Sequence, residues 1–179
     1  LPDTITAVGC WAHMRRKFTD TLKALLKEAR EKHPAQTGLR YCNKLFELEA
    51  GYAEKKLSFP ERFLERKERS APIAEEFFSW AKNEYDHNPV PKSAYGAALT
   101  YAVKQRGWLM NVFLDGRLEL SNNRAERAVR PFAVGRKNWL FSNTPKGASA
   151  SAAAYSIVET AKANGLRPFR YFQFLLERL

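Results

Sequence analysis

The feature that most constrains the fold of this chain is a helical repeat of apolar residues that runs through more than half of it. From Met14 to Leu114, apolar side chains recur every three or four positions, which places them on one face of an α-helix. Prolines divide this stretch, and each one ends a helix or opens the next. We therefore predict a lobe of packed helices from about Arg16 to Leu114.

Prolines, glycines and capping residues set the bounds of the predicted helices. Within the lobe, the segments are Met14 to His33, Leu39–Leu57, Pro60–Arg69, Pro72–Tyr85, Lys92 to Gly107 and Trp108–Leu114. Beyond the lobe, Ser121, Asn122 and Asn123 offer caps for a helix that reaches Arg130, where Pro131 is expected to stop or kink it. The last two predicted helices are Ala148–Ala163, closed by Asn164-Gly165, and Pro168–Leu179.

Three short segments have the composition of β-strands. They are Thr4–Val8, Arg117–Leu120 and Phe132–Phe141, which contain β-branched and aromatic residues or alternate in polarity. The sequence therefore predicts a mainly α-helical fold with a few short strands.

The charge of the chain favours a polyanionic partner. There are 30 Lys and Arg against 19 Asp and Glu, a formal net charge of +11. The excess is concentrated from Arg117 onwards, where eleven basic residues stand against four acidic ones. Such a charge is most often typical of nucleic-acid binding and sometimes of binding to an anionic membrane surface. Charge alone also fits a basic surface that contacts only solvent.

Length and composition exclude several classes of protein. With 179 residues, 45% of them hydrophobic, the chain can form a globular core without disulfides or metals. The longest apolar stretches, Leu109–Leu114 and Ala148–Val158, are too short or too polar to cross a membrane. Leu1–Cys10 lacks the composition of a signal peptide, and two cysteines make no disulfide framework. We therefore expect a cytoplasmic protein.

Most catalytic motifs are missing from the sequence. Cys10 and His13 have the spacing of half a zinc site, but Cys42, His33 and His87 offer no second pair. The sequence contains no nucleophile elbow, phosphate-binding loop or dinucleotide fingerprint. A zinc site, a hydrolase triad and ATP-driven chemistry are therefore not expected.

The segment Ser121–Pro131 concentrates charged residues on one predicted helix. Glu126 and Arg130 are four residues apart and share a face, with Arg127 beside them. One interpretation is structural, because Glu126 could cap the helix with Asn123 or form an ordinary ion pair with Arg130. The other interpretation is functional, because a carboxylate flanked by arginines could hold Mg²⁺ beside a nucleic-acid backbone.

Four blocks of sequence resemble signatures of the insertion-sequence-66 (IS66) family of bacterial transposases. The blocks are Gly9–Phe18, Asn122–Pro131, Gly135–Phe141 and Tyr155–Leu166. They occur in the order of the family, and the resemblance spans essentially the whole chain. The chain is therefore similar to the C-terminal part of an enzyme that cleaves and joins DNA strands during transposition of an insertion element.

This resemblance implies a ribonuclease H-like α/β catalytic core that is interrupted by an all-helical insertion. Residues 1–15 would hold the last core strand and the start of the following helix, and residues 16–114 the insertion. Residues 115–179 would be the C-terminal part of the core, with the helix of Glu126 and a helical tail.

The resemblance also assigns the acidic residues of a DDE transposase, which has two aspartates and one glutamate. Glu126 matches the glutamate. The aspartates would precede Leu1, since Asp3 lacks the sequence context that the family has there. The chain also starts without an initiator methionine, so we expect a fragment. Because the two aspartates would lie upstream of it, we expect this fragment to be inactive by itself.

The chemistry and the partners follow from the same resemblance. Two Mg²⁺ ions would activate the attacking oxygen and stabilise the leaving one, and Glu126 would be a metal ligand. The residues that would hold DNA phosphates are Asn123, Arg127, Arg130, Arg136 and Lys137. Trp139 and Phe141 would stack on an unpaired base or pack in the core. The expected partner is DNA, both element ends and target, bound by a homo-oligomer at the bacterial nucleoid, with no membrane involved.

Two other classes of protein remain open. A non-catalytic, basic helical module derived from a transposase would bind DNA through charge alone, although no helix-turn-helix signature supports it. An interaction domain would bind a partner through exposed aromatic side chains, for which Phe78 and Trp80 are candidates.

Overall fold

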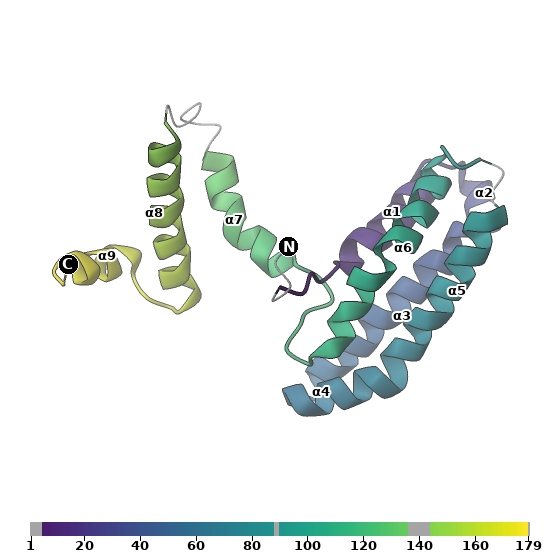
Figure 1. The fold of residues 1–179 in the computed structure, drawn as a ribbon, viewed down its shortest axis with the longest axis horizontal. Helices are drawn as coiled ribbons and strands as arrows, with labels where there is room; N and C mark the ends of the chain where they lie inside the picture. The colour runs from purple at the N-terminus through teal and green to yellow at the C-terminus, as the bar shows by residue number, and fades with distance from the viewer. Residues whose placement is uncertain (1–4, 88–89, 136–143, 179) are drawn as a thin grey trace. The chain divides into compact units, whose positions relative to one another are not determined.

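The computed structural model describes residues 5–87, 90–135 and 144–178, and within these ranges the chain is mainly helical (Figure 1). The chain divides into two compact units, Leu1–Asn122 (unit 1) and Asn123–Leu179 (unit 2). Unit 1 contains α1 (Trp11–Lys23), α2 (Lys27–Arg30), α3 (Ala35–Glu54), α4 (Phe59–Glu65), the π-helix η1 (Arg66–Ser70), α5 (Ala71–His87), α6 (Ala94–Met110) and the 3₁₀-helix η2 (Asn111–Leu114). Unit 2 contains α7 (Asn123–Gly135), α8 (Pro145–Ala163) and α9 (Pro168–Leu176).

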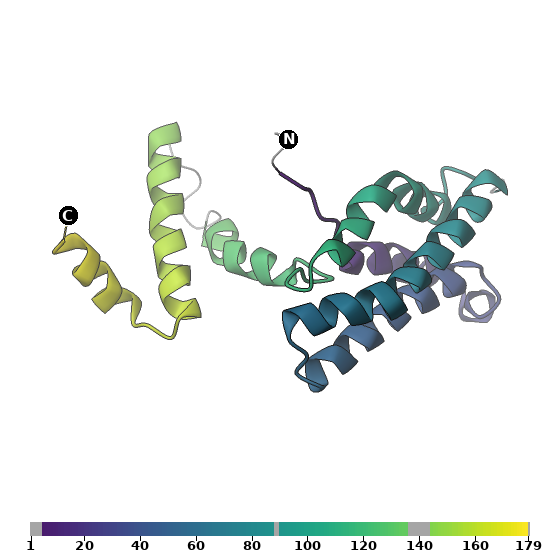
Figure 2. The same cartoon turned by 60° about the horizontal axis from the view of Figure 1, so that its bottom comes forward.

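Unit 1 is a four-helix bundle in which α1, α3, α5 and α6 surround one core (Figures 1 and 2). Aromatic rings fill much of this core. The centre of the Trp11 ring lies 5.5 Å from that of Phe77 and 5.6 Å from that of Phe78, and the rings of Phe18 and Phe77 are perpendicular with their centres 6.0 Å apart. Phe78 is only 3% exposed, and Trp80 packs against the same cluster. The mainly helical character is therefore confirmed, and these two aromatic residues do not form an exposed interaction surface.

The predicted helix Pro60–Arg69 does not end before Pro72, because α4 continues through the π-helical turn η1 into α5. At its start, Ser58 and Glu61 form a capping box, in which the Ser58 N–H donates to the Glu61 carboxylate at 2.8 Å. Pro72 has no N–H, so the carbonyl four residues before it cannot be paired as in an α-helix. The π-helical turn η1 lies directly before this proline, and α5 continues from it.

Arg66, the first residue of η1, is fully buried and ties three parts of unit 1 together. Its guanidinium donates to both carboxylate oxygens of Glu49 on α3, at 2.6 and 2.7 Å. It also donates to the main-chain carbonyls of Val112, Asp115 and Leu118, at 3.2, 3.1 and 2.8 Å. One side chain therefore holds the segment that leaves η2 against the bundle.

The expected ribonuclease H-like α/β core is wrong for the described residues, because they contain no β-strand. Thr4 lies outside them, and residues 5–10 pair with helix ends instead of a strand. The Gly9 N–H donates to the Trp108 carbonyl at 2.7 Å. The Ala7 carbonyl accepts from the Asn111 side chain at 2.8 Å. Since these main-chain groups are already bonded to α6 and η2, no ladder of strand pairs forms.

The other two predicted strands are also corrected by the structure. Residues 117–120 form turns and bends, and the Leu120 carbonyl accepts the N–H of Trp11 at 2.9 Å. Phe132–Gly135 continue α7, so Pro131 does not end the helix. The Phe132 ring packs 5.5 Å from the ring of Tyr155 on α8, and this contact favours continued helix over a break. The remainder of the predicted strand, residues 136–141, lies outside the described residues.

Two glycines on α3 provide a matched test of the bundle packing. A Cβ at Gly38 would lie 2.6 Å from the ring of Phe18, which is fully buried. We expect Gly38→Ala to lower the free energy of unfolding by about 1–3 kcal/mol. A Cβ at Gly51 would meet no described atom within 4 Å. Gly51→Ala should therefore raise the free energy of unfolding by up to about 1 kcal/mol, because alanine favours the helix. Urea denaturation checks both variants, and equal effects would contradict the packing at Gly38.

Unit 2 consists of three helices, of which α8 contacts both α7 and α9. Thr144 caps α8, since its hydroxyl accepts the N–H of Gly147 at 3.1 Å. Gly165 follows the end of α8 with a φ of +68°, a conformation that favours glycine, and this confirms the predicted end of the helix. Among the described residues, none of the helices combines the length and hydrophobicity needed to span a lipid bilayer.

Candidate nucleic-acid interface

Helix α7 brings four of the predicted site residues onto one face. Asn123, Glu126, Arg127 and Arg130 follow one another at steps of three, one and three residues, so they lie within one side of the helix. Asn123 and the two arginines are exposed, and Glu126 is half-buried. We call these four residues the α7 polar face.

The opposite side of α7 is apolar. Ala128, Val129 and Phe132 line a hollow of about 350 Å³ that α8 completes with residues such as Tyr155 and Glu159. The apolar side of α7 therefore packs toward α8, and the two arginines of the α7 polar face are exposed on the other side.

The electrostatics of the α7 polar face suit an anionic ligand held beside a carboxylate. Glu126 lies in the first turn, where the helix dipole stabilises a negative charge. The Arg127 side chain donates from Nε to the Asn123 carbonyl at 3.3 Å. Arg130 forms no hydrogen bond or ion pair with any described residue. The ion pair between Glu126 and Arg130 that their spacing allows is therefore not formed, and the Arg130 guanidinium can bind a phosphate.

The other predicted contacts lie outside the described residues. This holds for Arg136 and Lys137, which were predicted to hold DNA phosphates, and for Trp139 and Phe141, which were predicted to stack on a base. Their roles stay predictions.

The described residues do not by themselves fit a metal site. Mg²⁺ requires several oxygen ligands. No group of three His, Cys, Asp or Glu side chains within the described ranges is arranged to hold a metal ion. Glu126 thus offers one carboxylate rather than a complete site. Cys10 and Cys42 are buried thiols, and burial raises the pKa of Cys42 to about 12, which disfavours the thiolate that zinc requires.

The burial of Arg66 was not predicted from the sequence, because Arg66 lies in a run of charged residues that is typical of a solvent-exposed helix. A signal for its burial was present. Arg66 follows Phe59 and Phe63 at steps of seven and three residues, so it continues the apolar side of that helix, and the buried Ser70 follows it four residues later.

A net charge of +11 and two exposed arginines on one helix face are features typical of nucleic-acid-binding proteins. Comparison with known families makes this specific. The family model described as the transposase IS66 family matches residues 2–150, so the chain belongs to the IS66 family of transposases. The resemblance found in its sequence blocks is thereby confirmed.

Similar proteins occur in Sinorhizobium fredii. The uncharacterized protein y4qI is 32% identical over 177 residues, which cover 99% of this chain and 31% of that protein. The uncharacterized protein y4hP is 31% identical over 183 residues, which cover 98% of this chain and 32% of that protein. The chain therefore spans about a third of the length of the curated relatives it matches. No solved structure matches the chain.

Proposed function

We propose that this chain is a DNA-binding part of an IS66 transposase and contributes one acidic residue, Glu126, to strand cleavage and joining. The observation that carries this proposal is the α7 polar face, where a carboxylate and two exposed arginines share one side of a helix. Arg127 and Arg130 would bind DNA phosphates, which fix affinity and register rather than sequence. Asn123, Arg136 and Lys137 would add further backbone contacts.

The proposal leaves part of the catalytic centre to the rest of the full-length protein. Glu126 is the acidic member of the α7 polar face, and a single carboxylate cannot hold two Mg²⁺ ions. We therefore propose that acidic ligands from outside this chain complete the site and that the chain alone does not cleave DNA. Assembly of several copies on DNA is part of the same proposal.

The DNA contacts can be tested through the salt dependence of binding. We expect Arg127→Gln/Arg130→Gln to lower the slope of log K against log salt by about two, because each phosphate contact contributes roughly 0.9. The measurement is fluorescence anisotropy of a labelled duplex of random sequence, titrated with the full chain at several salt concentrations.

The control for this experiment removes two other charges from unit 2. Lys162 donates to Glu159 at 2.9 Å, and Arg170 donates to Gln173 at 3.2 Å, so both cations already have partners. Lys162→Gln/Arg170→Gln should keep the salt slope. An unchanged slope in Arg127→Gln/Arg130→Gln would mean that the α7 polar face does not bind DNA.

A second candidate is a non-catalytic DNA-binding module. The net charge of +11 and the exposed arginines of the α7 polar face would serve such a module without any metal ion. The two functions differ in the role of Glu126, so the cleavage activity of a full-length Glu126→Gln protein distinguishes them.

A further inference from the structure

The cations of unit 1 are unevenly distributed between its helices. Residues 11–44, which form α1, α2 and the first half of α3, contain nine Lys or Arg against three Asp or Glu. Residues 45–87 contain seven Lys or Arg against ten Asp or Glu. We call the first segment the basic half. Its cations are Arg15, Arg16, Lys17, Lys23, Lys27, Arg30, Lys32, Arg40 and Lys44.

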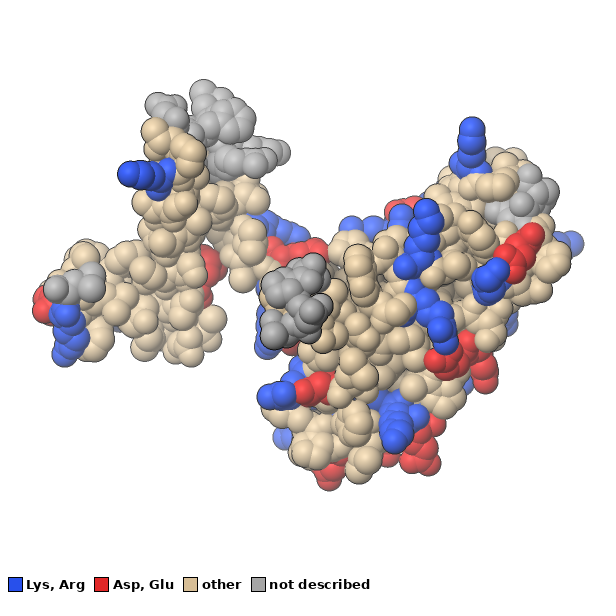
Figure 3. Space-filling view, in the orientation of Figure 1, with Lys and Arg blue, Asp and Glu red and all other residues tan. Residues whose placement is uncertain are grey.

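None of the nine cations of the basic half forms an ion pair with a described residue. In the rest of unit 1, five of the eleven cations pair with a carboxylate, namely Arg66, Arg69, Lys82, Arg106 and Arg117. On the face in Figure 3, basic and acidic side chains accordingly lie next to one another over α5 and α6. The basic half therefore carries six more cations than carboxylates, and its cations form no ion pair within the described chain.

Three of the cations on α1 and α2 have other contacts within the bundle. Arg15 lies over the Phe46 ring at 4.6 Å and Lys17 over the Tyr101 ring at 4.8 Å. Arg30 donates to main-chain carbonyls before α2, such as that of Leu25 at 3.0 Å. Among the described residues, the other six cations lie over no aromatic ring and donate to no main-chain carbonyl; they are Arg16, Lys23, Lys27, Lys32, Arg40 and Lys44.

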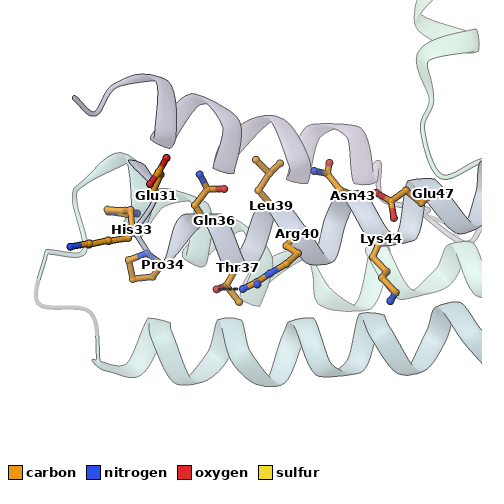
Figure 4. A pocket seen from close by; sticks show the side chains of 11 residues that line it. Glu31, His33, Pro34, Gln36, Thr37, Leu39, Arg40, Asn43, Lys44 and Glu47 are labelled. Atoms are coloured by element: carbon orange, nitrogen blue, oxygen red, sulfur yellow. Dashed lines mark hydrogen bonds between the residues drawn. The ribbon is translucent and has the colours of Figure 1, made fainter. Parts of the chain in front are cut away.

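A hollow of about 600 Å³ is lined by residues of α3 and of the turn before it (Figure 4). Lys32, Arg40 and Lys44 line it, and all three are exposed. Arg40 and Lys44 are one helical turn apart on α3, and among the described residues the Arg40 guanidinium donates only to the Thr37 hydroxyl, at 3.1 Å. The amide side chains of Gln36 and Asn43 add further donors, and Glu31 and Glu47 lie among the lining residues. We call Lys32, Gln36, Arg40, Asn43 and Lys44 the α3 cation groove.

We propose that the α3 cation groove is a second DNA-backbone surface, separate in sequence from the α7 polar face. A row of exposed cations with amide donors between them suits the repeated phosphates of a nucleic-acid strand, which accept hydrogen bonds without regard to sequence. Most of the residues that line the hollow are polar or charged, with Pro34 and Leu39 as the apolar ones, so their side-chain chemistry favours a charged partner. The charge distribution of unit 1 carries this inference, which does not depend on a catalytic role for Glu126.

The test is the salt dependence of DNA binding by the full chain, measured with Arg40→Gln/Lys44→Gln. We expect the slope of log K against log salt to fall by about two, with the melting temperature and the helix content unchanged. The matched control is Lys55→Gln/Lys67→Gln, which removes two exposed charges from the acidic part of the bundle and should keep the slope.

The result for the α3 cation groove can be interpreted independently of the result for the α7 polar face. An unchanged slope in Arg40→Gln/Lys44→Gln would overturn the α3 cation groove, whatever Arg127→Gln/Arg130→Gln shows. A loss of binding to poly-glutamate with an unchanged DNA slope would assign the groove to an acidic protein and also overturn the proposal. If the full chain binds no DNA at low salt, neither surface binds DNA.

Discussion

In a full-length transposase that contains this chain, Glu126→Gln should lower the rate of strand cleavage at least about 100-fold. Mutation of residues that only hydrogen-bond to a metal ligand already costs roughly 10–100-fold, and Glu126 is proposed to be a ligand itself. Glutamine keeps the size of the side chain and removes its charge. Glu126 is half-buried in the first turn of α7, so the fold should change little. The loss of its favourable interaction with the helix dipole should cost about 0.3–1 kcal/mol of stability. Cleavage of a labelled element end in Mg²⁺ and the thermal melting curve are measured side by side.

The control for Glu126→Gln is Glu177→Gln, which removes an exposed carboxylate from the other end of unit 2. It should cleave DNA as the unchanged protein does. If Glu126→Gln retains full cleavage, Glu126 is a structural residue of α7 and the non-catalytic function is the better description of this chain. Binding to DNA should persist in both variants, because the arginines of α7 remain.

Arg66→Met should lower the free energy of unfolding of unit 1 by about 3–5 kcal/mol, the usual cost of leaving one member of a buried ion pair alone. The change would leave the Glu49 carboxylate without its guanidinium and would remove the donor from three main-chain carbonyls. Urea denaturation followed by circular dichroism measures the loss.

A double variant separates the charge from the packing at Arg66. Glu49→Leu/Arg66→Met removes both charges, and an apolar replacement of a buried ion pair is often neutral or stabilising. We therefore expect the double variant to be more stable than Arg66→Met, although the carbonyls of Val112, Asp115 and Leu118 still lack their donor. Equal stability of Arg66→Met and the unchanged chain would contradict the buried network.

The helices were predictable where a local signal determines them. Pro60 and Pro168 each lie in the first turn of a helix, and Gly165 has the positive φ expected after a helix end, as the sequence indicates. Pro131 shows the limit of local signals. It lies inside α7, because Phe132 packs on Tyr155, a residue more than twenty positions away that the local pattern does not reveal.

The strands were predicted from composition and from a family resemblance, and neither specifies a pairing partner. Residues 5–10 and 117–120 have groups that a sheet could use, but Gly9, Trp11 and Asn111 bond within the bundle instead. For the candidate site, the sequence correctly predicted a helix that carries Glu126, Arg127 and Arg130 on one side. It could not reveal that Arg130 lacks an acidic partner in the described chain, since that depends on side-chain rotamers.

The acceptors that Arg66 binds after η2 are all main-chain carbonyls, and every amino acid supplies one. Substitutions at Val112, Asp115 or Leu118 therefore leave the acceptors in place. An insertion or deletion between these positions would move at least one carbonyl out of reach of a side chain that is fixed by Glu49. The chain between η2 and α7 should thus tolerate changes of composition and resist changes of length.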